Sequence, residues 1–348
     1  MGDFTAQELE NITNAALDFH FQKGKVFPQT LQDKPLLRDM MAKSKTFPGG
    51  KENITVRVKG DYTTSIMGYQ NDDQVTYANP ANIKTATFPW KEIHWGIQIS
   101  LSELKKDGIS ISDTATGTGE QRHSDRDMTV LANLLDDKIE DMKEGGERGM
   151  NLMLWKDGTQ DAKQVPGIRS FIVNSPSSGS AIGGLDPVAN TWWRNRASLA
   201  VNASTASNQN LIKELQKEFR QLRRYGSPKH KAYAGSDFLT AMENELRVNG
   251  MFTQDGWAKS GRIDASVADL AFKGVEINYD PTLDDLSLAK YCYVLDTNQI
   301  FPMVMEGEDM KTHNPARPAD QYVLYRAKTW TGGLVVRQRN TSGVYSIA

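Results

Sequence analysis

The sequence has 348 residues, and its 41 Lys and Arg against 43 Asp and Glu give a net charge of −2. A chain of this length can bury a sizeable core and divide into two or three folding units. The near-neutral charge argues against a protein that grips nucleic acid over a broad surface, because such proteins carry a clear basic excess. Cys292 is the only cysteine, which excludes an internal disulfide and a thiolate metal cluster.

The first 60 residues change the sign of their charge. Residues 1–20 are acidic and lack Lys and Arg, whereas residues 21–60 hold nine basic residues against three acidic ones. Pro28, Pro35 and Pro48 make a long regular helix improbable there. We therefore predict an extended arm that finds its stability on another surface, either of its own chain or of a neighbour. The N-terminus does not resemble a signal peptide and no apolar run is long enough to span a membrane, so we expect a soluble cytosolic product.

Two strands are predicted on either side of a long polar segment. Apolar and polar residues alternate over Ile54–Val58 and again over Ile93–Ile99. Between them, Gly60 to Ile83 is polar and rich in turn formers, with Asn71-Asp72-Asp73 near its middle. A hairpin turn needs only about two to five residues. We therefore expect the long segment to dock on another subunit.

A long helix is predicted to begin at the capping pattern of Ser124 and Asp127, because apolar residues then recur at helical spacing. Three glycines should loosen or bend this helix before Met150–Trp155: Gly145, Gly146 and Gly149.

The second half of the chain predicts two shorter helices and several strands. One helix runs from Ser207 to stop signals at Gly226 and Pro228, and another is capped at Ser236. Strands are expected at Lys231–Ala234, Val275–Asn278, Tyr291–Asp296, and Tyr322–Arg337 with an interruption at Gly332-Gly333. Helices and strands are segregated rather than alternating, which indicates an α+β fold instead of a doubly wound parallel sheet.

Residues capable of catalysis or ligand binding form no convincing motif. None of the five histidines has a second His or Cys at ligand spacing. A cluster of carboxylates on the long helix could support the acid/base chemistry of a hydrolase. However, Lys143 lies three residues after Glu140, and Arg148 lies four after Glu144. This is the spacing of ion pairs on a solvated helix face, which is the favoured interpretation. We therefore predict no catalytic, cofactor-binding or metal site, and hence no enzyme.

The densest aromatic cluster is Trp192-Trp193, followed by Arg194-Asn195. It could stack on a sugar or a base, but packing in a core or an interface is favoured because paired Trp side chains supply a large area for burial.

Four segments, in this order, resemble the major capsid proteins of tailed bacteriophages with the Hong Kong 97-type fold. They are residues 34–38 with 43–51, residues 183–186 with 192–195, residues 207–250, and residues 272–281 with the strand at 291–296. The order and spacing of these segments match the family pattern across nearly the whole chain.

The resemblance implies a fold with an N-terminal arm (1–50) and an extended β-hairpin loop (51–100, tip 60–83). It also implies a peripheral domain containing a long spine helix (101–164), an axial domain (165–290) and a return to the peripheral domain (291–348). Contacts between subunits are expected from Lys34 and Arg38 in the arm, from Trp192 and Trp193, and from five residues of the loop. These are Tyr62, Ile66, Met67, Tyr69 and Tyr77.

The function implied is self-assembly into hexamers and pentamers of an icosahedral head that encloses double-stranded DNA, built in the host cytoplasm and present in the virion. The expected partners are further copies of the chain, a portal protein and non-specifically packaged DNA, with no membrane. Gly60 to Ile83 contains no lysine, so we expect noncovalent contacts in place of the isopeptide cross-link that some members form there. Because only about 50 residues precede the first strand, we also expect a separately encoded scaffolding protein. The alternative is an encapsulin-like nanocompartment shell.

Overall fold

The computed structural model describes most of the chain, and the described residues fall into two compact units. The described residues are 4–5, 32–62, 64–77, 79, 82–100, 102, 106, 111–112, 125–178, 180–203, 210–226, 229–248, 270–313 and 323–348. Unit 1 comprises Met1–Gln32, Glu92–Met150 and Gly307–Thr331, and unit 2 comprises Asp33–Lys91, Asn151–Glu306 and Gly332–Ala348.

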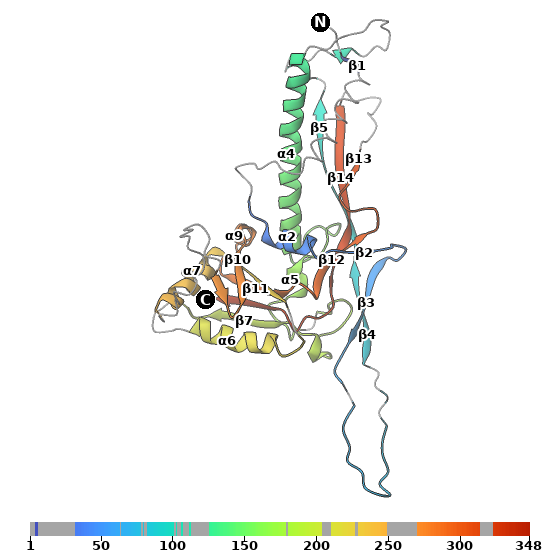
Figure 1. Ribbon diagram of the computed structural model, residues 1–348, viewed down its shortest axis with the longest axis vertical. Helices are drawn as coiled ribbons and strands as arrows, with labels where there is room; N and C mark the ends of the chain where they lie inside the picture. The colour runs from blue at the N-terminus through green and yellow to red at the C-terminus, as the bar shows by residue number, and fades with distance from the viewer. Residues whose placement is uncertain are drawn as a thin grey trace. The chain divides into compact units, whose positions relative to one another are not determined.

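Helices and strands are both present, which confirms the predicted α+β class (Figure 1). The helices are α2 (Pro35–Met41), α4 (Asp125–Trp155), α5 (Ile168–Phe171), α6 (Asn210–Leu222), α7 (Ser236–Val248), α9 (Pro281–Asp285) and the 3₁₀-helix η1 (Thr191–Trp193). The strands of the first half are β1 (Phe4–Thr5), β2 (Lys45–Phe47), β3 (Asn53–Lys59), β4 (Ile83–Pro89), β5 (Lys91–Ser100) and β6 (Ile111–Ser112). Those of the second half are β7 (Arg196–Val201), β8 (His230–Ala234), β9 (Leu270–Phe272), β10 (Val275–Tyr279), β11 (Tyr291–Asp296), β12 (Ile300–Met305), β13 (Lys311–His313), β14 (Val323–Val336) and β15 (Gly343–Ile347).

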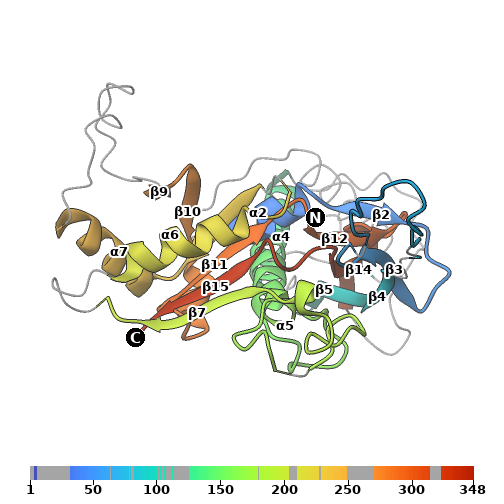
Figure 2. The same ribbon diagram turned by 90° about the horizontal axis from the view of Figure 1, so that it is seen from below.

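Unit 2 is built on a mixed six-stranded sheet in the order β7-β15-β11-β8-β10-β9. The central strand β11 pairs antiparallel with both β15 and β8, whereas β10 pairs parallel with β8. Helices α6 and α7 lie side by side over this sheet (Figure 2) and share a hydrophobic core with it. The predicted stripe of α6 is confirmed, because Leu211, Leu215, Phe219 and Leu222 are all buried.

The β3–β4 pair of unit 2 is an antiparallel hairpin in register from Asn53↔Pro89 to Lys59↔Ile83. The predicted alternation over β3 is confirmed by the burial of Ile54 and Val58. Strand β4 was not among the predicted strands, although Ala86 and Phe88 alternate with threonines and are buried. The long polar segment therefore joins two strands that pair with each other.

In unit 1, β5 alternates between half-buried and exposed positions as its sequence predicted, and it pairs with β14. The predicted long helix is also present as α4, in which Ile139 and Met142 are buried. Its cap at Ser124 lies outside the described residues, as does the Ser207 cap predicted for α6.

Glycines break neither of the two elements in which the sequence marked them. Helix α4 continues without interruption through Gly145, Gly146 and Gly149 to Trp155. Strand β14 likewise continues through Gly332-Gly333 instead of breaking there. A Cβ at Gly333 would lie only 2.5 Å from the Pro89 carbonyl oxygen, so glycine at this position admits a close backbone neighbour rather than a turn.

Candidate assembly surface

Exposed apolar side chains gather on the segment that joins β3 to β4. Tyr62, Ile66, Tyr69 and Tyr77 are 81%, 105%, 73% and 93% exposed. Met67, Val75 and Ile83 of the same hairpin are also exposed. Among the described residues, this hairpin holds seven of the eleven exposed large hydrophobic side chains. Such a concentration of exposed apolar groups is typical of an interaction surface.

The apex of this segment is a tight turn over Gln70–Asp73 (Figure 1 shows the strand ends from which it extends). The Asp73 N–H donates to the Gln70 carbonyl at 3.1 Å, and the Gln70 N–H donates to the Asp73 carboxylate at 2.9 Å. Asn71 has a φ of 45°, a left-handed conformation that Asn tolerates better than most residues. Local hydrogen bonds therefore hold the Asp73 carboxylate in the turn, and Asp72 lies next to it at the apex.

The root of the hairpin borders a groove of about 490 Å³. Gly60 packs on the indole of Trp192, where a Cβ would lie 2.9 Å from the ring. Four exposed cations line the groove: Arg57, Lys59, Arg224 and Arg337. Asp61 is the one acidic residue among the described residues that line it. The groove is therefore basic as well as aromatic.

A buried cation lies beneath this groove. Arg339 is fully buried and donates to the carbonyls of Phe171 and Trp193 at 2.8 and 2.7 Å and to the Asn195 side chain at 2.9 Å. Burial lowers the pKa of Arg339 to about 10, so the guanidinium stays charged at neutral pH. Its three hydrogen-bond acceptors are neutral, so they leave its positive charge uncancelled.

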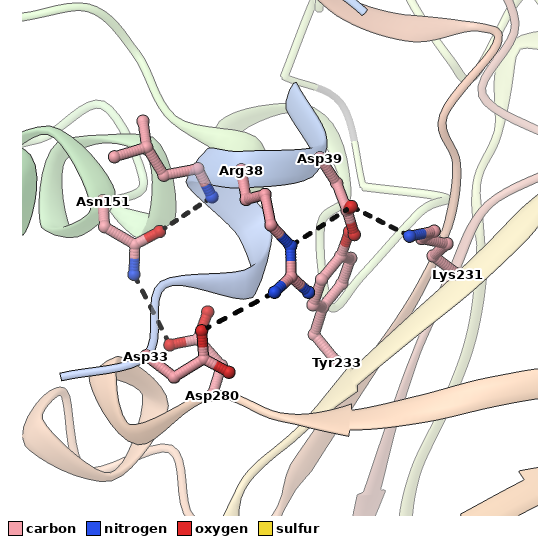
Figure 3. Close-up of polar contacts among 8 residues, drawn as sticks. Asp33, Arg38, Asp39, Asn151, Lys231, Tyr233 and Asp280 are labelled. Carbon is pink, nitrogen blue, oxygen red and sulfur yellow. Dashed lines mark hydrogen bonds and ion pairs between the residues drawn. The ribbon is translucent and has the colours of Figure 1, made fainter. Parts of the chain in front are cut away.

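Helix α2 is fixed to the rest of unit 2 by two polar clusters (Figure 3). Asn151 accepts from the Leu37 N–H at 3.1 Å and donates to the Thr282 hydroxyl at 2.7 Å. At the other side of α2, the Asp39 carboxylate accepts from Lys231 at 2.8 Å and from the Tyr233 hydroxyl at 2.7 Å. The residues around α2 are therefore stabilised by their own chain.

The arm residues Lys34 and Arg38 and the Trp pair were predicted to contact other subunits. Lys34 is only 9% exposed, and Arg38 lies on the surface 3.9 Å from the carboxylates of Asp33 and Asp39. Trp193 is 1% exposed and donates to the Ile182 carbonyl at 3.0 Å, so its ring is covered by its own chain. Trp192 lines the groove and meets Trp193 edge to face at 5.8 Å.

The acidic, histidine and cysteine side chains do not gather into a metal site within the part of the chain that the structure describes. No group of three or more His, Cys, Asp and Glu there could hold a metal ion.

Of the two ion pairs expected on α4, Glu144–Arg148 forms at 2.6 Å, whereas Glu140 and Lys143 do not pair. Cys292 is buried in β11, which raises the pKa of its thiol. No described helix is long and apolar enough to cross a membrane.

Comparison with known proteins relates this geometry to solved structures. The sequence matches no protein-family model and no curated protein. The structure matches the cyanophage A-1(L) capsid asymmetric unit with a TM-score of 0.64 at 13% identity, over 92% of this chain and 94% of that one. It matches the mature capsid of bacteriophage PhiM1 with a TM-score of 0.57 at 10% identity, over 93% and 90%. The capsid of the native GTA particle matches with a TM-score of 0.56 at 15% identity, over 93% and 94%.

The chain has the fold of tailed-phage capsid proteins. The TM-scores of 0.56–0.64 establish the capsid fold. Identities of only 10–15% establish nothing finer, because function is carried by sites and not by folds. The resemblance seen in the sequence is thereby confirmed for the fold. Sequence reasoning missed Arg224 and Arg337, which reach the groove from the end of α6 and the end of β14, and no local pattern marked them.

Proposed function

We propose that this protein is a major capsid protein that self-assembles into the head of a tailed bacteriophage. The observation that carries the proposal is a match to phage capsid structures over more than nine-tenths of both chains. The exposed apolar hairpin supports it, because an isolated chain gains nothing from keeping these side chains in water. The matched capsids belong to phages and a GTA particle, which favours a phage head over the nanocompartment alternative.

The proposal assigns capsid roles to the parts of the chain. Residues 1–50 are the arm, the β3–β4 hairpin is the extended loop, and α4 is the spine helix of the peripheral domain. The six-stranded sheet with α6 and α7 is assigned to the axial domain. Because β11 and β15 are strands of that same sheet, the assignment extends the axial domain beyond the expected boundary at residue 290.

In this function the work of the protein is mechanical. Copies form hexamers and pentamers through noncovalent contacts, and the icosahedral shell encloses double-stranded DNA. Modest interfaces, repeated by symmetry, add to a stable shell. Scaffolding and portal proteins are the further partners that the proposal implies. Denaturing electrophoresis of assembled shells should return only single chains, because Gly60 to Ile83 offers no lysine for a cross-link.

Paired variants of the hairpin test the proposal. Ile66→Ser and Tyr77→Ser remove exposed apolar groups, so we expect unfolding free energies within about 0.5 kcal/mol of wild type and loss of assembly. Phe88→Ala at the root is the matched control; it should destabilise the subunit by about 3–5 kcal/mol because Phe88 is buried. Thermal unfolding and analytical ultracentrifugation measure the two effects. Full assembly of both serine variants would count against the proposal.

A further inference from the structure

The groove at the root of the hairpin carries unbalanced positive charge. Arg57, Lys59, Arg224 and Arg337 are exposed, and none of them forms an ion pair with a carboxylate among the described residues. The buried Arg339 lies beneath them without an acidic partner there. Five cations against the single carboxylate of Asp61 favour an anionic occupant.

Aromatic side chains also line the groove and give it an apolar component. Trp192, Tyr62 and Tyr225 line it, and Tyr225 is 43% exposed. The Lys59 ammonium lies 4.4 Å from the centroid of the Tyr62 ring, and the Arg224 guanidinium lies 5.4 Å from that of Tyr225. An occupant with both acidic and aromatic groups would match the two kinds of lining residue.

The apex of the hairpin has this chemistry. Asp72 and Asp73 lie at the Gln70–Asp73 turn, and the segment from Gly60 to Ile83 contains no Lys or Arg to balance them. Tyr69 and Tyr77 flank the turn and are 73% and 93% exposed. The two surfaces are therefore complementary in charge, and both present aromatic rings.

We propose that the groove of one copy receives the acidic apex of the hairpin of a second copy. The proposal rests on the proposed function and adds the receiving surface. Because the apex and the groove are different surfaces, the contact is heterologous, and its repetition gives a ring of subunits where the rotation between neighbours closes. Double-stranded nucleic acid would offer phosphates to the cations but keeps its bases stacked inside the duplex, whereas the hairpin apex presents exposed aromatic rings together with its carboxylates.

Disulfide trapping between two full-length variants tests the contact. Gln74→Cys places a thiol beside the apex and Gln299→Cys places one at the groove, and neither removes a charge. The native Cys292 is buried and does not compete. Mixed under mild oxidation, the two variants should give about tenfold more cross-linked heterodimer than Gln299→Cys mixed with a Lys213→Cys control on the exposed face of α6.

Charge reversal supplies the second measurement. Arg224→Glu with Arg337→Glu, or Asp72→Lys with Asp73→Lys, should each raise the protein concentration needed for assembly by about tenfold or more, and the four changes together should restore it. Lys213→Glu should leave it unchanged. Assembly of the groove or apex variant at the wild-type concentration, or a defect confined to the groove variant, would overturn the proposal. Shells without the heterodimer overturn this contact alone, whereas the heterodimer without shells or rings overturns the proposed function alone.

Discussion

The glycines of α4 differ in what surrounds them. A Cβ at Gly146 would overlap the indole of Trp95 in β5, whereas Gly145 and Gly149 have nothing within 4 Å of such an atom. The sequence predicted a weak point in the helix because glycine has a low helix propensity. It could not predict that Gly146 makes room for a ring about 50 residues earlier in the chain, because this is a tertiary contact.

The matched pair Gly146→Ala and Gly149→Ala tests this difference. Gly146→Ala should lower the free energy of unfolding by about 1–3 kcal/mol through overpacking against Trp95. Gly149→Ala should raise it by roughly 0.5–1 kcal/mol, because alanine loses less conformational freedom in a helix. Chemical denaturation of the two variants measures both effects. Equal stabilisation by both substitutions would show that Trp95 moves aside at no cost.

The buried Asp280 carboxylate links stability to pH. Burial raises the pKa of Asp280, although Trp155 and Thr282 donate hydrogen bonds to it at 2.7 and 3.0 Å. Because the folded pKa is above the unfolded one, this group favours the folded state most below the unfolded pKa of about 3.9. That contribution is lost as the pH rises through the folded pKa. Asp280→Asn cannot titrate, so the stability of wild type relative to this variant should rise as the pH falls from 7 to 4. Denaturant midpoints across that range provide the measurement, and a constant difference would contradict the account.

At the scale of elements, α2 shows how a short helix from a predicted arm is held in place. Its apolar residues Leu36, Leu37 and Met40 are buried, and Asp39 joins it to β8 through Lys231 and Tyr233. Within the described residues 32–60, the proline-rich sequence correctly argued against a long helix. It could not show that the partner surface lies about 190 residues later in the chain.

Two aspartates, Asp39 in this helix and Asp33 just before it, give a matched test. Asp39→Ala removes the carboxylate that accepts hydrogen bonds from the Lys231 ammonium and the Tyr233 hydroxyl. It should therefore destabilise the subunit by about 1–3 kcal/mol. Asp33→Ala should change stability by less than about 0.5 kcal/mol, because the Asp33 side chain is 69% exposed and lies 3.9 Å from Arg38. Thermal unfolding distinguishes the two. Similar small effects from both variants would mean that Asp39 does not anchor α2.

For the whole molecule, periodic patterns predicted the elements that bury one face. The stripes of α6 and α4 and the alternation of β3 and β5 are of this kind. Strand β4 was missed because Thr85, Ala86 and Thr87 give only a weak apolar signal. The exposed hairpin residues could be chosen from sequence because apolar groups lay in a polar segment, whereas the groove depends on side chains brought together from distant segments.

Electron microscopy of the purified chain tests the central claim most directly. Negatively stained samples of the full chain, alone and with any scaffolding protein encoded beside it, should contain closed shells, sheets or hexameric rings. Such particles are the expected result for a subunit whose hairpin exposes apolar groups to be covered by other copies. A strictly monomeric protein under both conditions would contradict the capsid function.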